Sequence, residues 1–99
     1  MRMLVEVTIP VEPGNDPIKD GRLPKTIAAA VEQLRPEAMY FYPKHGRRHA
    51  IWVVDLKDPS EIPPLFDRFV GELNAEVEIS PVMTLEELQK GLKQLAGQR

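Results

Sequence analysis

The chain has 99 residues, of which 42% are hydrophobic and 28% are charged, and this composition is typical of one ordinary globular domain. The formal net charge of −2 argues against nucleic acid or an anionic membrane surface as a partner, because both usually select a basic excess. The absence of cysteine excludes disulfides and thiolate metal sites. Because no apolar run approaches the roughly 20 residues that a bilayer requires, we expect no membrane partner. We expect a cytoplasmic protein with a single domain over residues 1–99.

The first third of the chain predicts a strand, a loop and a helix. Apolar residues alternate over residues 3–9, which indicates a strand. Residues 10–17 hold the proline and glycine typical of a loop, and a short helical turn is expected to follow. A helix is predicted over residues 23–35, where Pro36 ends it. Its apolar stripe consists of Ile27, Ala30, Val31 and Leu34.

The middle of the chain predicts a β-hairpin. Residues 37–42 are rich in aromatic side chains and indicate a second strand, which residues 43–47 turn back into a third. That third strand, residues 49–56, is apolar on both alternating faces and is too short for a helix. It is therefore predicted to be buried on two sides.

The register of this hairpin decides which side chains share a face. If His45 and Gly46 are the two central residues of the turn, Tyr42 lies opposite His49 and Tyr40 lies opposite Ile51. Met39, Phe41, Ala50, Trp52 and Val54 would then face the core. A slip of one residue would send His49 and both tyrosines to the opposite face.

The last third of the chain predicts two helices around a strand. Residues 58–61 begin a helix whose prolines, Pro63 and Pro64, lie in its first turn, where few amide donors are needed. Residues 74–81 alternate again and indicate a fourth strand. Thr84 and Glu87 form a capping box that opens a terminal helix through about residue 95. The apolar stripe of that helix consists of Leu85, Leu88, Leu92 and Leu95.

The order strand, helix, strand, strand, helix, strand predicts an α+β protein of the ferredoxin-like split βαβ type, with a four-stranded antiparallel sheet and an additional C-terminal helix. Right-handed crossovers place both helices on one face and strands one and three in the centre, with strand two beside three and strand four beside one. The other face of the sheet is then uncovered. The simplest cover is a second copy, so we expect a homodimer.

Three segments carry a resemblance to a known superfamily. PEAMYFYP at residues 36–43, HAIWVVDLKDPSEIP at 49–63 and NAEVEISPVMTLEEL at 74–88, together with the element order, resemble small proteins of the dimeric α/β-barrel superfamily. This superfamily is similar in fold to muconolactone isomerases and to cofactor-independent or haem-degrading monooxygenases. The resemblance implies a homodimer with facing sheets, and it suggests isomerase- or oxygenase-like chemistry by analogy of fold only. It carries over no catalytic residue, and we expect no cofactor.

The uncovered sheet face holds the candidate functional residues. Its expected members are Glu6, Thr8, Tyr40, Tyr42, His49, Ile51, Val53, Glu76 and Glu78. A histidine, two phenols and carboxylates on an otherwise apolar surface can form a small-molecule pocket with acid and base groups. The candidate ligand-binding residues are therefore Glu6, Tyr40, Tyr42, His49 and Glu78. The alternative is that these groups are polar contacts of an interface or are solvated.

Other site types find little support in the sequence. His45 and His49 flank a turn, so helical metal-ligand spacing does not apply and no metal is expected. Lys44, His45, Arg47 and Arg48 form a basic turn that could hold an anion, although exposed turn charges usually bind nothing specific. The glycines form no nucleotide-binding pattern, and the sheet aromatics lack the motif of an RNA-recognition platform. Two classes remain open: a small-molecule enzyme or binding protein, and a dimerisation or protein-interaction module. Whether the chain is an enzyme stays open.

Overall fold

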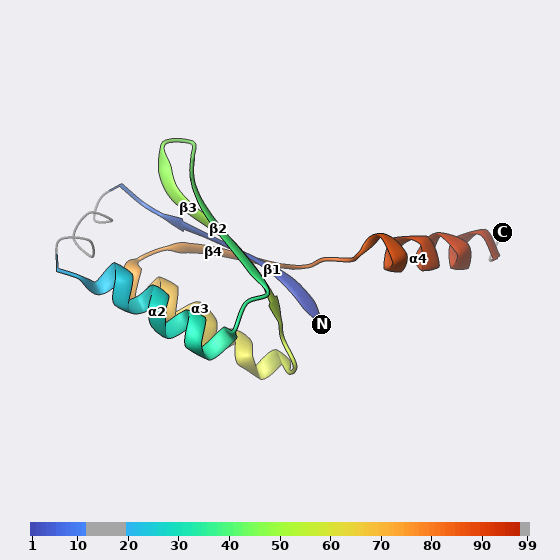
Figure 1. The fold of residues 1–99 in the computed structure, drawn as a ribbon, viewed down its shortest axis with the longest axis horizontal. Helices are drawn as coiled ribbons and strands as arrows, with labels where there is room; N and C mark the ends of the chain where they lie inside the picture. Colours follow the sequence, from blue (N-terminus) through green and yellow to red (C-terminus); the bar gives the residue numbers. More distant parts are fainter. Residues whose placement is uncertain (12–19, 98–99) are drawn as a thin grey trace.

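The computed structural model describes residues 1–11 and 20–97, and within them it shows four antiparallel strands and three α-helices (Figure 1). In chain order the elements are β1 (Arg2–Ile9), α2 (Arg22–Leu34), β2 (Ala38–Lys44), β3 (Arg47–Asp55), a short 3-10 helix η1 (Pro59–Glu61), α3 (Ile62–Leu73), β4 (Glu76–Pro81) and α4 (Leu85–Gly97). The predicted strands and long helices are confirmed, with boundaries that differ by a few residues. The short helical turn predicted after residue 17 lies outside the described residues.

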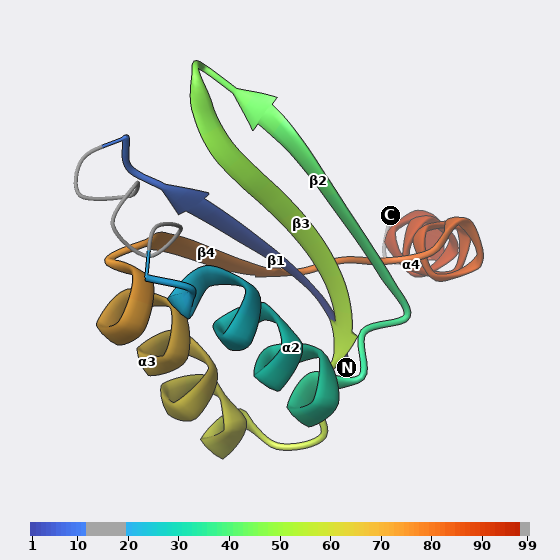
Figure 2. The ribbon, with the colours of Figure 1, turned by 60° about the vertical axis from the view of Figure 1, so that its left-hand side comes forward.

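The four strands form one sheet in the order β2-β3-β1-β4. Helices α2 and α3 lie side by side on one face of it, as Figure 2 shows. This is the arrangement that right-handed crossovers predict, with the doubly apolar β3 in the centre next to β1. The chain is thus an α+β protein whose sheet is compatible with a ferredoxin-like fold.

The hairpin between β2 and β3 has the predicted register. His45 and Gly46 have φ angles of 53° and 73°, and two central residues with positive φ are typical of the tight turn that matches the twist of a hairpin. Tyr42 pairs with His49, and Tyr40 pairs with Ile51. The one-residue slip is therefore excluded, and the alternating side chains fall on the predicted faces.

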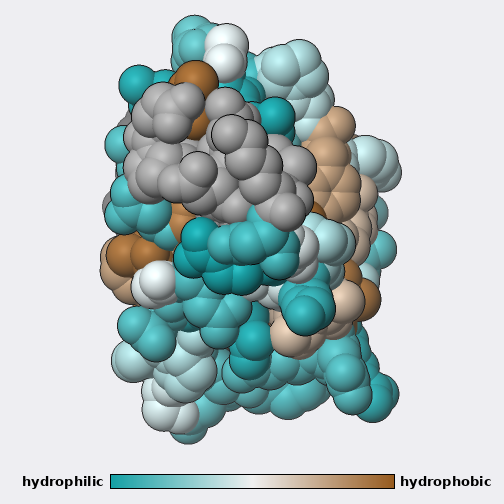
Figure 3. Space-filling model, turned by 90° about the vertical axis from the view of Figure 1, so that its left-hand side faces the viewer, coloured by the Kyte–Doolittle hydropathy of each residue, from teal (hydrophilic) through white to brown (hydrophobic). Residues whose placement is uncertain are grey.

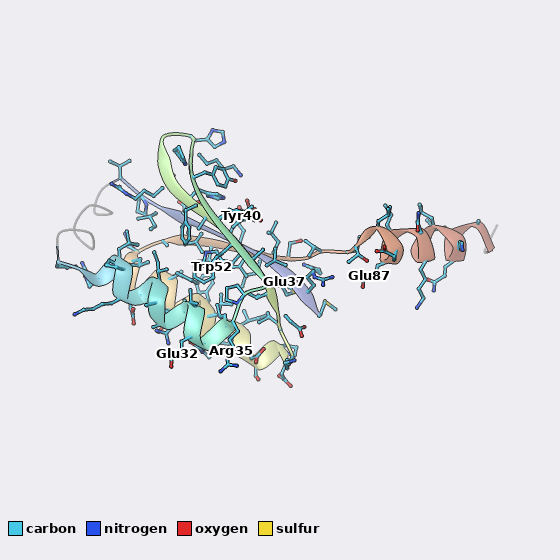
Figure 4. All side chains as sticks on the ribbon, viewed as in Figure 1. Glu32, Arg35, Glu37, Tyr40, Trp52 and Glu87 are labelled. Carbon is cyan, nitrogen blue, oxygen red and sulfur yellow. The ribbon has the colours of Figure 1, made fainter. Side chains whose placement is uncertain are left out.

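The core lies between the helices and the sheet face that β1 and β3 present to them. Trp52 is 1% exposed and packs edge-on against Phe69 of α3, with ring centroids 5.4 Å apart. In Figure 4, Trp52 lies on the helix side of the strands and Tyr40 on the other side. The other buried apolar residues are Met3, Val5, Val7, Ile9, Ala30, Ala50, Val54, Leu56, Leu65, Leu73 and Ala75.

Phe41 departs from the prediction that it belongs to this core. Its ring contacts Trp52 edge-on, with centroids 6.2 Å apart, yet the residue is 54% exposed. The reason is its place on β2, an edge strand that lies beyond the part of the sheet covered by α2 and α3 (Figure 2). The sequence pattern gives the face of a side chain but not how far the helix layer reaches.

Left-handed residues end both packed helices. Arg35 has a φ of 45° after α2, and Asn74 has a φ of 54° after α3, and both donate their backbone N–H to carbonyls of the last turn. Because Asn74 closes the helix, β4 begins at Glu76 and not at residue 74. At the other end, Asp58 accepts a 2.9 Å hydrogen bond from the Ser60 N–H and caps η1, which leads into α3.

Helix α4 leaves the body of the molecule (Figure 1). Its capping box is confirmed: the Thr84 N–H donates to Glu87 Oε1 at 2.8 Å, and the Glu87 N–H donates to Thr84 Oγ1 at 3.2 Å. No residue of α4 is buried. The radius of gyration is 16.2 Å, whereas a compact chain of this length has about 13 Å. Helix α4 therefore does not pack on its own domain, and its apolar stripe remains exposed. None of the described helices is long and apolar enough to cross a bilayer.

Candidate functional site

The sheet face opposite α2 and α3, which we call the open face, carries all five predicted ligand-binding residues. Glu6 lies between Ile51 of β3 and Glu78 of β4. Thr8, two residues along β1, lies opposite His49, and His49 lies opposite Tyr42. Because side chains two residues apart on a strand share a face, the register brings these groups to the same surface.

His49 is a buried polar group on the open face, near the hairpin end of β3. Only 4% of its side chain is exposed. Its Nδ1 lies 2.8 Å from Thr8 Oγ1, and its Nε2 lies 3.3 Å from Glu6 Oε1. The ring of Tyr42 covers it edge-on, with centroids 5.1 Å apart. A neutral imidazole with its proton on Nε2 donates to Glu6 and accepts from the Thr8 hydroxyl, so both ring nitrogens are satisfied within one chain.

The Glu6 carboxylate joins the buried imidazole to the surface. Its side chain is 26% exposed, and its Oε1 accepts from both His49 Nε2 and Lys44 Nζ, the latter at 3.5 Å. Both contacts are at the long end of hydrogen-bond geometry. Glu6 therefore keeps acceptor capacity for a further donor that approaches from the open face.

A depression of about 280 Å³ opens beside this network. Its lining residues are Glu6, Thr8, Lys44, His45, Arg47, His49, Glu76 and Glu78. Lys44 and Arg47 belong to the hairpin on one side, whereas Glu76 and Glu78 belong to β4 on the other. The strand order β2-β3-β1-β4 thus separates the positive from the negative side chains, with the Glu6–His49 pair between them.

The structure brings together three of the five predicted site residues in this depression: Glu6, His49 and Glu78. Tyr42 contacts the His49 ring without lining the depression, and Tyr40 is 63% exposed and lies outside it.

Five residues of the depression were missing from the predicted ligand set: Thr8, Lys44, His45, Arg47 and Glu76. Thr8 and Glu76 were expected on the open face, but their closeness to His49 depends on β1 pairing, which no short-range signal gives. The basic turn was visible in the sequence, but its approach to Glu6 was not.

A second hollow, of about 290 Å³, lies on the helix side of the sheet. Apolar side chains such as Ile27, Phe41 and Trp52 line it, and no described carboxylate does. The Trp52 Nε1 group is buried and has no hydrogen-bond partner among the residues described. Because that nitrogen is enclosed by its neighbours, it is not a group that this hollow offers to a ligand. Tyr42, Arg48 and His49 also line this hollow, so it borders the residues of the candidate site but brings no further carboxylate to it.

Within residues 1–11 and 20–97, no group of three or more histidine, aspartate or glutamate side chains is arranged to hold a metal ion. No protein-family model matches the chain, and a search of the curated proteins finds no match.

Proposed function

We propose that the chain binds a small hydrophilic molecule that carries both a positive and a negative group, in the depression beside Glu6 and His49, and that a second copy closes this depression. The observation that carries the proposal is the separation of charge across the depression, with a buried histidine in between. Ligand sites commonly combine a concave surface with a few convergent polar groups. Here those groups come from all four strands, so the sheet itself holds them in place.

The charges of the depression define the ligand class. An anionic group fits beside Lys44 and Arg47, and a cationic group fits beside Glu76 and Glu78, where ion pairs would be charge-assisted hydrogen bonds. Neither Glu76 nor Glu78 forms an ion pair among the described residues, and both are exposed. These carboxylates are therefore free to accept from an ammonium group. Free amino acids are the simplest molecules of this class.

A second copy is the proposed cover of the open face. The face also presents Ile51 and Val53 of the central strand, both only partly buried, beside the exposed ring of Tyr40. Apolar side chains at the centre of a sheet face favour burial against another surface. The depression alone is at the small end of ligand sites, which begin at about 300 Å³. Two facing copies, as the resemblance to dimeric α/β barrels implies, would form a larger and drier chamber.

The proposal is tested by ligand binding to the unmodified protein. Thermal-shift measurements with the individual free amino acids as probes should give a rise in Tm for at least one of them, and native mass spectrometry should detect the same molecule on the protein. Glu78→Gln should weaken that binding at least tenfold, because it removes one charged partner. The control Glu32→Gln lies on α2, in the layer on the other side of the sheet (Figure 4), and should bind as the unmodified chain does. Equal loss in both variants, or no shift with any amino acid, would contradict the proposal.

A second candidate function is a dimerisation or protein-interaction module without a ligand. One observation favours it: both ring nitrogens of His49 already have partners within the chain. On that hypothesis the Glu6–His49–Thr8 network orders the sheet face for contact with another subunit. His49→Ala separates the two functions. Loss of amino-acid binding by an intact dimer supports the ligand site, and a weakened dimer without any ligand effect supports the interaction module.

A further inference from the structure

We infer that α4 of one copy packs its leucine stripe along the exposed aromatic strand β2 of a second copy, reciprocally in the two subunits. The inference rests on the proposed homodimer and names the contact that holds it together. The two surfaces concerned are the only long runs of exposed large apolar residues among the described parts of the chain.

The leucine stripe of α4 has no surface in its own chain. Leu85, Leu88, Leu92 and Leu95 are between 42% and 64% exposed, and Met83 before them is 64% exposed. A single 13-residue helix is marginal in water, and α4 also contains Gly91 in its interior, which weakens helices further. A helix of this kind is stabilised by burying its apolar face. Its own body does not offer that surface.

Strand β2 presents the complementary surface. Its consecutive aromatic residues Tyr40, Phe41 and Tyr42 are 63%, 54% and 40% exposed, so apolar rings project on both sides of an edge strand. Exposed edge strands are usually covered or protected, because their free backbone groups can pair with other chains. Pro43 is the one residue of β2 that has no backbone N–H to donate. The rest of β2 needs a cover.

The sheet order prevents α4 from covering β2 of the same chain. Helix α4 follows β4, and β4 and β2 are the two opposite edges of the sheet. In both Figure 1 and Figure 2, α4 lies apart from the sheet and from α2 and α3. Among the coloured residues in Figure 3, which shows the end of the body opposite α4, most are hydrophilic and the hydrophobic ones lie in separate patches. A second copy is therefore the occupant that we assign to β2.

Length and charge agree with this pairing. The 13 residues of α4 span about 20 Å and the seven residues of β2 span about 23 Å, so the helix can follow most of the strand. The first turn of α4 carries Glu86 and Glu87, whereas Lys44 ends β2 and Arg47 begins β3 at the hairpin turn. Opposite charges favour the orientation in which the start of α4 lies near the hairpin turn. Two such contacts, related by a twofold axis, form a closed dimer.

The absence of native cysteine allows a direct cross-linking test. Full-length Tyr40→Cys protein is mixed with isotope-labelled full-length Leu92→Cys protein under mild oxidation. We expect a mixed disulfide dimer of the two proteins, because a disulfide forms only when the two backbones come within about 7 Å. Lys90→Cys in place of Leu92→Cys is the control, since residue 90 lies on the opposite side of α4 from the stripe. Both helix variants leave the body of the domain intact, as α4 contributes no buried residue to it.

The outcomes separate this inference from the proposed function. A mixed disulfide at residue 92 in at least tenfold excess over residue 90 supports the inference, whether or not amino acids bind. A dimer by light scattering that gives equal cross-linking at both positions overturns the inference and leaves the ligand proposal standing. A stable monomer at micromolar concentration, or a helix whose leucines associate instead with phosphatidylcholine vesicles, also overturns it.

Discussion

The Nδ1 atom of His49 lies 2.8 Å from the Oγ1 atom of Thr8, and this hydrogen bond joins the two central strands across the open face. The residues are 41 positions apart in the chain, so only the pairing of β1 with β3 brings them together. A buried ring nitrogen without a partner costs about 1–3 kcal/mol. The bond therefore stabilises the sheet and also holds the His49 ring in place in the site.

Thr8→Val should lower the free energy of unfolding by about 1–3 kcal/mol, because the isosteric valine leaves the His49 Nδ1 atom buried without a partner. Urea denaturation of the variant and the unmodified chain measures this difference.

The double variant Thr8→Val/His49→Phe is the control for this explanation. Removing both polar partners can be nearly neutral, so the double variant should be more stable than the sum of the two single changes predicts. Strict additivity of the two losses would show that the hydrogen bond does not couple Thr8 to His49.

Truncation of the chain after Met83 should convert the proposed dimer into a monomer at micromolar concentration. The truncation removes four leucines, each of which contributes about 1.5–3 kcal/mol when fully buried, so even partial burial corresponds to more than a tenfold loss of affinity. Light scattering on both proteins gives the mass. A truncated protein of unchanged mass and Tm would show that α4 is dispensable for association.

Substituting alanine for each of two glycines should change stability in opposite directions. Gly46 has a φ of 73° in the hairpin turn, so Gly46→Ala should destabilise the chain by about 1–2 kcal/mol through backbone strain, although nothing lies within 4 Å of the added carbon. Gly91 also has open space around it, but it lies inside α4, and Gly91→Ala should raise the helix stability by about 1 kcal/mol. Urea denaturation tests the first change, and far-UV circular dichroism tests the second. A neutral Gly46→Ala would contradict the strained-turn assignment.

Acid should weaken the start of α4. The Thr84 backbone N–H, and then the Thr84 side chain, hold the pKa of the exposed Glu87 carboxyl below its usual range. A lowered pKa means that the cap contributes fully above the ordinary glutamate pKa of about 4.3, and that its contribution is lost as the pH falls through the lowered value. In Glu87→Gln the helical signal should lose this acid dependence, whereas Glu86→Gln, at a residue without a capping bond, should keep it. Circular dichroism over an acid titration makes the comparison.

Local sequence signals determined most of the secondary structure and which side chains lie on the open face of the sheet. The alternation in β1 and β4, the Thr84 capping box and the His45-Gly46 turn act over a few residues, so their consequences could be predicted. The turn alone placed Tyr42 opposite His49, and that pairing is confirmed. The turn assigned Tyr40, Tyr42 and His49 to one face, the alternation in β1 and β4 added Glu6 and Glu78, and all five lie there.

The extent of the helix layer and the composition of the depression were decided by the tertiary structure alone. Phe41 has the pattern of a core residue, but it lies on an edge that the helices do not reach, and its exposure depends on how α2 and α3 pack. The leucines of α4 have the pattern of a packed stripe, yet periodicity does not say which surface receives it. Lys44 meets Glu6 and Thr8 meets His49 across 38 and 41 residues. Such contacts follow from strand pairing in space, which short-range propensity cannot specify.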